Sequence, residues 1–292
     1  MIRIGIVGAE NTHSYSVAAT LNINKAVPGA AVVAIWGETD EFAKTAAKKG
    51  QIPLIVKKPT DMIGQVDAIM VDHRHAKLHL PAAEAFLEKK LPLFIDKPFS
   101  YRLAEGKAFL AKARKLGVPV TSFSAIPHQQ SFATMMQKVR KAGEVRAVSS
   151  IGPADIKSPW GGIFFYGVHQ VDMLIEAFGP EIVAVSVAKK KVGEKFSAIA
   201  ALFWASGLMA TMQCLNGAQT GFQLAVSTDG GILSDKLAFD ADPYLMGTRC
   251  FVKMFKTGKE PFTHSRILSP IAVLEAMEKA VTSGKLEKVA KT

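Results

Sequence analysis

Short apolar runs alternate with segments of helical spacing through the first 122 residues. The runs predict buried strands at 2–7, 31–35, 68–71, 93–95 and 118–121. The segments between them predict helices near 14–22, 41–49, 80–87 and 104–116. Such alternation is typical of βαβ units, and strands apolar on both faces indicate a parallel sheet between helical layers. Residues 1–122 are therefore predicted to form an α/β, doubly wound Rossmann domain, entered through Arg3 to Gly8.

Past residue 122 the pattern changes to successive strands joined by short turns such as Ala205-Ser206-Gly207 and Asp229-Gly230-Gly231. The expected strands are 144–150, 182–187, 197–204, 208–215, 222–227 and 231–239, with helices near 131–141, 168–178 and 270–282. Residues 123–292 are predicted to form an α+β domain with an open, mainly antiparallel sheet. Residues 285–292 are expected to be a frayed end.

The length of 292 residues suits two packed domains. The longest apolar runs, such as 198–205, are far shorter than the roughly 18 residues that span a bilayer, so no membrane partner is expected. The chain enters a strand pattern without the features of a secretory leader, which favours the cytoplasm. Cys214 and Cys250 cannot make a disulfide framework and are interpreted as small buried hydrophobes.

The net charge of +11 would favour acidic partners through long-range attraction. The basic residues are nevertheless scattered over many segments, and no nucleic-acid-binding motif accompanies them. A solvated basic surface is the preferred interpretation, and no nucleic-acid partner is expected.

The loop after the first strand departs from a dinucleotide fingerprint. Gly8 stands where G-x-G-x-x-G would begin, but Glu10 and His13 occupy the second and third glycine positions. The second glycine normally lets a pyrophosphate approach the backbone, and a carboxylate at Glu10 would repel it. A bound dinucleotide is therefore expected to take an altered phosphate path over Asn11, Thr12 and the helix N-terminus.

Two further positions bear on the same loop. The usual acidic ribose ligand at the end of the second strand is replaced by Gly37, with Glu38 just beyond it. His13 has two open interpretations: it contacts a ligand, or it hydrogen-bonds the Glu10 carboxylate and stabilises a tight turn.

Asp96-Lys97-Pro98 follows the buried strand 93–95, at the edge of a doubly wound sheet where ligands bind. Gly161-Gly162 and Gly167-Val168-His169-Gln170-Val171-Asp172 follow later in the chain. Together these motifs resemble the Gfo/Idh/MocA family of sugar and polyol oxidoreductases, whose usual Glu-Lys-Pro would appear here as Asp96-Lys97-Pro98. The resemblance covers nearly the whole chain.

The resemblance implies an NAD(P)-dependent dehydrogenase, with the choice between NAD and NADP open. Lys97 would polarise the reacting oxygen and bridge to the nicotinamide ribose, while His169 and Asp172 would meet the small-molecule substrate. A lysine or histidine of tuned pKa can remove the O–H proton that hydride transfer from an alcohol requires. The family's open sheet also implies a homo-oligomer, a dimer or tetramer.

The candidate site residues follow from these motifs and loops. The predicted catalytic residues are Lys97 and His169, and the predicted substrate-binding residues are Asp172, Tyr166, His128 and Trp160. The predicted cofactor-binding residues are Gly8, Asn11, Thr12, His13, Glu38, His73, Asp96 and Lys97.

One departure favours a different function. Many members of the family carry an aspartate two residues before the glycine that corresponds to Gly167, whereas this chain has Phe165 there. The adjacent Tyr166 is a candidate substitute proton carrier. The alternative is a catalytically inactive sensor of the same fold that binds a nucleotide or sugar.

A third hypothesis comes from the segment after strand 68–71. Asp72, His73, His75 and His79 lie within eight residues, and imidazoles so spaced can converge on one metal ion. The preferred interpretation has no metal: His79 stands at a helix start, and His73 reaches phosphate or substrate. His73 and His75 would point to opposite faces of a continuing strand.

Overall fold

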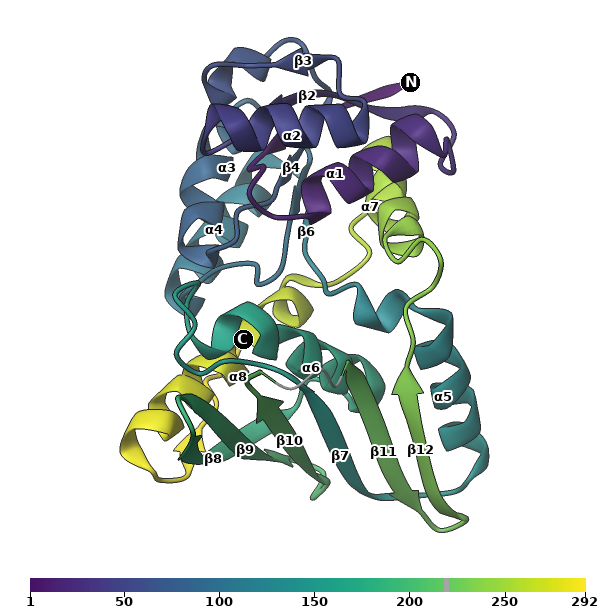
Figure 1. Cartoon of the computed structure of the whole chain (residues 1–292), viewed down its shortest axis with the longest axis vertical. Coiled ribbons are helices and arrows are strands. Elements are labelled where there is room, and N and C mark those ends of the chain that lie inside the picture. The colour runs from purple at the N-terminus through teal and green to yellow at the C-terminus, as the bar shows by residue number, and fades with distance from the viewer. Residues whose placement is uncertain (218–220) are drawn as a thin grey trace. The chain divides into compact units, whose positions relative to one another are not determined.

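The computed structural model describes residues 1–217 and 221–292 and divides the chain into two compact units (Figure 1). The first unit holds residues 1–123 and 242–267, and the second holds residues 124–241 and 268–292. This division differs from the sequence-based domains 1–122 and 123–292 at residues 242–267, which return to the first unit.

The first unit contains a parallel sheet of six strands in the order β3-β2-β1-β4-β5-β6, which confirms the predicted doubly wound domain. Its strands are β1 (Ile2–Val7), β2 (Ala30–Trp36), β3 (Leu54–Ile55), β4 (Ala68–Val71), β5 (Leu93–Ile95) and β6 (Val120–Thr121). Its helices are α1 (His13–Ala18), α2 (Asp40–Gly50), α3 (His79–Glu88), α4 (Leu103–Leu116) and α7 (Leu245–Thr257). A π-helical turn, Ala19–Ile23, continues α1.

The ends of α2 and α4 follow local capping chemistry. The Thr39 side chain accepts a hydrogen bond from Phe42 N at 3.1 Å and so satisfies one of the unpaired donors at the start of α2. At the other end of α2 the left-handed residue is Gln51, with a φ of 49°. Gly117 ends α4 in the left-handed region, which glycine adopts without strain.

Helix α7 packs into the core of the first unit beside α1 (Figure 1). The Phe251 side chain is 1% exposed, and its ring stacks on Phe94 of β5 with centroids 4.5 Å apart. The segment is anchored at both ends, since Asp242 accepts a hydrogen bond from Thr20 and Lys256 donates one to the carbonyl of Pro28. These contacts explain why residues 242–267 belong to the Rossmann unit.

The second unit is built on a seven-stranded sheet in the order β12-β11-β7-β10-β9-β8-β13. Its strands are β7 (Val145–Pro153), β8 (Ile182–Val192), β9 (Lys195–Trp204), β10 (Met209–Leu215), β11 (Phe222–Thr228), β12 (Gly231–Leu237) and β13 (Glu287–Lys288). Only β7 and β10 among these described neighbours run parallel, which confirms the predicted mainly antiparallel sheet.

Three helices accompany this sheet, and the chain's tail joins it. The helices are α5 (Gln130–Lys141), α6 (Ile163–Phe178) and α8 (His264–Ser283), of which residues 268–283 belong to the unit. The prediction of a frayed tail is wrong at β13, because Glu287 and Lys288 pair with Val185 and Ala184 of β8. Across the described ranges 1–217 and 221–292, no helix combines the length and apolar character that a membrane crossing needs.

The packing of α7 predicts a large effect of Phe251→Ala. Removing a fully buried phenyl ring should lower the free energy of unfolding by about 3–5 kcal/mol, because transfer and cavity terms add. Denaturant unfolding followed by circular dichroism measures this loss. Met246→Ala, on the exposed side of the same helix, is the control and should change stability by less than about 0.5 kcal/mol. A loss below about 1 kcal/mol for Phe251→Ala would contradict the assignment of α7 to the first unit's core.

Candidate functional site

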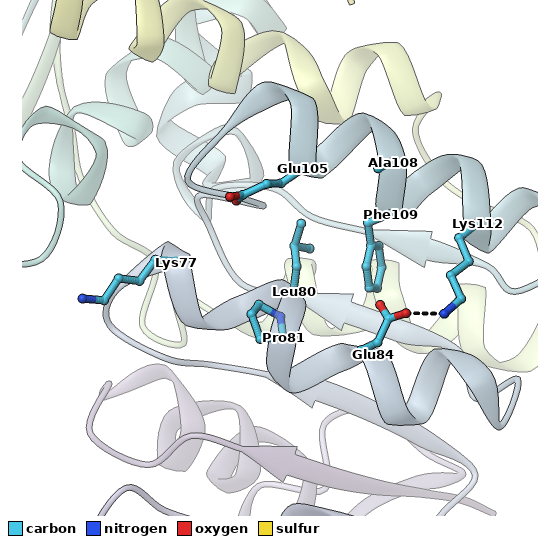
Figure 2. Close-up of a pocket in the computed structure, with 8 residues that line it drawn as sticks. All are labelled: Lys77, Leu80, Pro81, Glu84, Glu105, Ala108, Phe109 and Lys112. Atoms are coloured by element: carbon cyan, nitrogen blue, oxygen red, sulfur yellow. Dashed lines mark hydrogen bonds and ion pairs between the residues drawn. The ribbon is translucent and has the colours of Figure 1, made fainter.

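A groove between α3 and α4 has a volume of about 440 Å³ (Figure 2). Leu80 and Phe109 contribute apolar surface, and an ion pair between Lys112 and Glu84 joins the two helices. This charge pair is satisfied within the groove, and the groove holds none of the predicted site residues. The reactive side chains of the first unit gather elsewhere, at the carboxyl edge of its sheet.

Three neighbouring strands bring polar residues to that edge. In the sheet register Val7 of β1 pairs with Val71 of β4, and Val71 pairs with Ile95 of β5. The next residue of each strand is therefore Gly8, Asp72 or Asp96. Because parallel strands end at the same edge, residues 88 positions apart in the sequence become neighbours, and the edge is the usual ligand site of such sheets.

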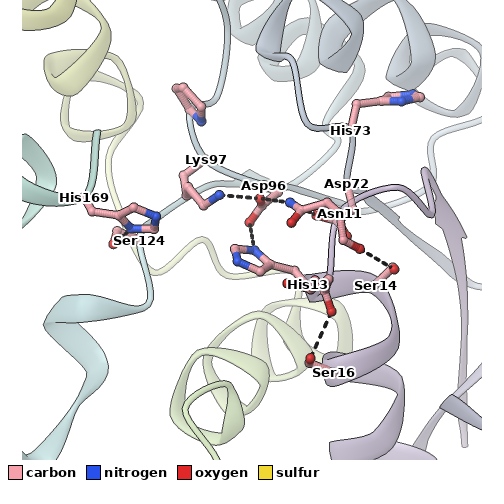
Figure 3. A network of polar contacts seen from close by, with 12 residues as sticks. Asn11, His13, Ser14, Ser16, Asp72, His73, Asp96, Lys97, Ser124 and His169 are labelled. Atoms are coloured by element: carbon pink, nitrogen blue, oxygen red, sulfur yellow. Dashed lines mark hydrogen bonds and ion pairs between the residues drawn. The ribbon is translucent and has the colours of Figure 1, made fainter. Parts of the chain in front are cut away.

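Asp96 is the centre of a buried network (Figure 3). Its Oδ2 lies 3.2 Å from Lys97 Nζ and accepts a hydrogen bond from Asn11 Nδ2 at 3.2 Å. Its Oδ1 lies 3.1 Å from His13 Nδ1. Burial alone would raise the pKa of Asp96, but the charges of His13 and Lys97 outweigh it and hold that pKa well below the usual range. The carboxylate therefore stays ionised and keeps Lys97 in place.

Asp72 is fully buried beside this network, and its pKa moves the other way. Asn11 Nδ2 donates to its Oδ1 at 2.8 Å, so one amide group joins both carboxyl groups. Its Oδ2 has no hydrogen-bond partner among the described residues. Burial, reinforced by the charge of Asp96, raises the pKa of Asp72 well above its ordinary value. Two adjacent carboxyl groups thus differ in their tendency to hold a proton.

His13 supports this network rather than the turn. Its Nδ1 pairs with Asp96, so the alternative in which His13 bonds Glu10 is wrong. Burial lowers the pKa of His13, partly against the charge of Asp96. The structure places His13 with Lys97 and Asn11 around the Asp96 carboxylate.

Glu38 occupies part of the loop where a phosphate usually binds. Its Oε2 accepts hydrogen bonds from the backbone N–H of Ala9 at 2.8 Å and of Glu10 at 3.0 Å, and its Oε1 lies 2.7 Å from His73 Nδ1. Burial raises the pKa of Glu38, but the bonds from His73 and Ala9 outweigh it and lower that pKa. These two amides are therefore already filled by a carboxylate of the chain itself.

Gly8 and Glu10 fix the shape and charge of the same loop. Gly8 has a φ of +109°, and a Cβ there would lie 2.7 Å from the carbonyl carbon of Asp72, so only glycine fits. Arg74 lies 3.8 Å from the Glu10 carboxylate and offsets its charge. Burial raises the pKa of Glu10. The backbone N–H groups of residues 11–13 have no acceptor among the described residues, so the first turn of α1 can receive an anion.

The three histidines after β4 do not converge on a metal ion. His79 is buried with Nδ1 2.8 Å from the carbonyl of Pro98 and Nε2 2.8 Å from that of His73. Burial lowers the pKa of His79 to about 4. His75 Nδ1 accepts a hydrogen bond from Lys77 N, and His73 faces Glu38. His79 therefore tethers two loops, which corrects the hypothesis of a metal site at His73, His75 and His79.

In the second unit α6 presents the predicted histidine and aspartate on one face, three residues apart. His169 Nδ1 lies 2.8 Å from Ser124 Oγ, and the Ser124 backbone N–H donates to Asp172 Oδ2 at 2.9 Å. Both side chains are buried. Ser124 thus orients both residues, yet the sequence pattern did not single it out. Its one signal was its place immediately after the predicted domain boundary.

The remaining substrate-binding candidates surround the start of α6 or precede α5. Tyr166 is 43% exposed, and its ring centroid lies 5.7 Å from that of His169. Trp160 lies against Phe165, with centroids 6.4 Å apart. His128 is half-buried in the 3-10 turn Ile126–His128, a few residues past Ser124. Phe165 is thus part of an aromatic cluster at the position where the resemblance implied an aspartate.

Comparison with known proteins gives a family match over the first unit. Residues 2–124 match the Gfo/Idh/MocA model, described as an oxidoreductase family with an NAD-binding Rossmann fold. An uncharacterised oxidoreductase of Escherichia coli K12, YhhX, is 30% identical over 124 residues, which are 39% of this chain. The match spans about a third of that relative's length, 36%.

Solved structures resemble the whole chain. A probable dehydrogenase from Thermotoga maritima has a TM-score of 0.85 at 19% identity, covering 99% of each chain. Scyllo-inositol dehydrogenase from Lactobacillus casei, solved with NAD(H) and scyllo-inositol, has a TM-score of 0.86 at 16% identity, covering 100% of each chain. Myo-inositol dehydrogenase from the same organism, solved with NAD(H) and myo-inositol, has a TM-score of 0.83 at 15% identity, covering 100% of this chain and 98% of that one. At these identities the likeness shows the fold.

The opposite behaviour of the two carboxyl groups predicts how stability depends on pH. An unfolded aspartate has a pKa of about 3.9, and that of folded Asp72 is higher. Between these values the folded protein keeps a proton that the unfolded chain has lost, so the free energy of unfolding falls as pH rises. Asp72→Asn is neutral at every pH and should remove that loss. Denaturant midpoints at pH 5 and pH 8 measure the difference between variant and wild type.

Asp96→Asn is the matched control for this measurement. The folded pKa of Asp96 is depressed, so its stabilisation is present above the unfolded pKa and is lost as pH falls. The control should therefore be less stable than wild type at both pH 5 and pH 8. If Asp72→Asn shows the same change between the two pH values as wild type, Asp72 does not carry the raised pKa.

Proposed function

We propose that this protein is an NAD-dependent dehydrogenase of a polyol, sugar or related hydroxy compound, because residues 2–124 match the Gfo/Idh/MocA oxidoreductase model. The observation that carries the proposal is the buried Lys97–Asp96 pair at the carboxyl edge of the Rossmann sheet. The likeness to inositol dehydrogenases solved with NAD(H) supports the polyol class.

The loop residues fit a dinucleotide that takes a modified path. With the amides of Ala9 and Glu10 filled by Glu38, the phosphates would take the backbone N–H groups of residues 11–13, together with Thr12. The backbone of Asp72 lies so close to Gly8 that no side chain fits there, so the loop carries no side chain at this turn. When bound, NAD supplies the hydride acceptor.

Lys97 acts on the substrate oxygen in this proposal. Lys97 Nζ is held 3.2 Å from the Asp96 carboxylate, so in this proposal it donates a hydrogen bond to the hydroxyl or developing carbonyl oxygen. We assign the hydroxyl proton to His169 Nε2, because Ser124 Oγ orients the ring through Nδ1. Asp172, Tyr166, His128 and Trp160 would contact the rest of the substrate.

A ligand-binding sensor without turnover is the second candidate function. Glu38 accepts hydrogen bonds from two loop amides that often bind a pyrophosphate. Phe165 stands where many members of the family that the chain resembles carry an aspartate. Both observations concern residues that would contact a ligand, and neither disturbs the Rossmann sheet, as a sensor of the same fold requires. Turnover that depends on Lys97 separates the two candidates.

Lys97→Ala is expected to lower kcat for polyol-dependent reduction of NAD by about 10²- to 10⁴-fold, the range of a lost acid–base or electrostatic group. NADH binding, followed by fluorescence, should change only a few-fold. Lys89→Ala, an exposed lysine at the end of α3, is the matched control and should behave as wild type. Turnover that survives in Lys97→Ala would refute the catalytic role. Binding of neither NADH nor NADPH at millimolar concentration would refute the proposed function itself.

We also propose that the protein is a homo-oligomer through the sheet of the second unit. Ile199 of β9 and Met209 of β10 are 52% and 55% exposed, and Phe203, paired with Met209, shares their face. Large apolar side chains exposed on one face of a sheet are typical of an association surface. Sedimentation should give a dimer or tetramer of the 31.4 kDa chain, and Ile199→Lys should shift it toward monomer. A wild-type mass of 31.4 kDa at micromolar concentration would contradict this proposal.

A further inference from the structure

One set of side chains at the edge of the first sheet has the composition of a metal site. Among the described residues, His13, Asp72 and Asp96 are the one group of three or more potential ligands whose atoms all lie within 4.8 Å of one another. We propose that these three residues bind one divalent transition-metal cation. The inference does not depend on hydride transfer, and of its three residues only Asp72 belonged to the metal hypothesis drawn from the sequence.

Asp72 provides the observation that points to a ligand. Its side chain is fully buried, and the Oδ2 atom has no hydrogen-bond partner among the described residues. A buried acceptor that is left unsatisfied destabilises the fold. Holding Lys97 requires only Asp96, so the ion pair does not account for a second carboxyl group at this position. A cation bound between the two carboxyl groups would satisfy it.

The chemistry of the set limits which cation fits. One imidazole nitrogen and two carboxylate oxygens suit Zn²⁺, Mn²⁺ or Co²⁺ better than the all-oxygen ligands that Ca²⁺ prefers. His13 Nδ1 and Asp96 Oδ1 are 3.1 Å apart, a separation that two ligand atoms on one ion can have. The Asn11 amide lies against both carboxyl groups and, turned over, would offer its oxygen as a fourth ligand.

The position of Lys97 is compatible with a bound cation but limits its affinity. Lys97 Nζ contacts Asp96 Oδ2, whereas His13 faces Asp96 Oδ1, so the ammonium and the cation would use different oxygens. Two carboxylates and one ammonium leave a net charge of −1, which favours a divalent ion. We therefore expect exchangeable binding rather than a permanently held structural ion.

The test is direct binding of Mn²⁺ to the full-length protein after chelation and desalting, followed by electron paramagnetic resonance. We expect one Mn²⁺ per chain, and Co²⁺ should give visible absorption bands of a site with nitrogen and oxygen ligands. Asp72→Asn and His13→Gln should each weaken binding by at least about tenfold. His75→Gln, a partly buried histidine outside the cluster, is the matched control and should bind as wild type.

Two outcomes would overturn the proposal. One is the absence of stoichiometric binding of Mn²⁺, Zn²⁺ and Co²⁺ at millimolar concentration. The other is binding that His75→Gln abolishes and Asp72→Asn leaves intact, which would place the ion elsewhere. Circular dichroism checks that each variant is folded. If Asp72→Asn does not fold, the alternative measurement is the nuclear magnetic resonance signal of the His13 imidazole in the wild type. Bound Mn²⁺ should broaden that signal until it is lost, and an unchanged signal counts against the site. These measurements need no turnover, so their failure is distinct from failure of the dehydrogenase proposal.

Discussion

The ionised carboxylate of Asp96, buried at the carboxyl edge of the Rossmann sheet, is the interaction on which the candidate site depends. A buried charge is costly unless it is paired and hydrogen-bonded. Asp96 meets this requirement through Lys97, His13 and Asn11, which come from its own strand end and from the loop after β1. The same contacts that make the charge tolerable fix the position of Lys97. The contacts that stabilise the buried Asp96 carboxylate are therefore the same contacts on which the proposed chemistry of Lys97 depends.

The departures from the dinucleotide fingerprint acquire a physical meaning in this network. His13, at the third glycine position, pairs with Asp96, and Glu10, at the second, lies near Arg74. Glu38 fills amides that the loop would otherwise offer to a phosphate. Glu10 and Glu38 are joined by the hydrogen bond from the Glu10 backbone N–H, whereas His13 contacts Asp96. In the proposed function, the first turn of α1 is therefore left to receive the phosphates.

In the second unit a single residue, Ser124, orients the two side chains of the family motif. Ser124 offers its hydroxyl to His169 and its backbone N–H to Asp172, so one residue orients both side chains of the family motif. A histidine whose Nδ1 is engaged in this way has a defined orientation for Nε2, as a proton carrier requires. In the proposed function His169 therefore serves as the proton acceptor.

The sequence by itself determined the fold class and the position of the main motifs, because both are local patterns. The bounds of β1, β4 and β5 agree to the residue with the apolar runs, and the family match covers the domain that the motif Asp96-Lys97-Pro98 indicated. The period of the apolar positions also predicted the mainly antiparallel sheet. It did not predict β13, because this strand forms by pairing with β8 and not through a local preference of its own residues.

Only the tertiary structure decided which polar groups meet. His13 and Asp96 are 83 positions apart, and no local pattern selects Asp96 over the neighbouring Glu10 as the partner of His13. The return of α7 to the first unit depends on an aromatic contact between Phe94 and Phe251. Ser124 likewise gains its role from residues 45 and 48 positions away. The order of strands in the sheet sets these partners, and strand order is a property of the assembled chain.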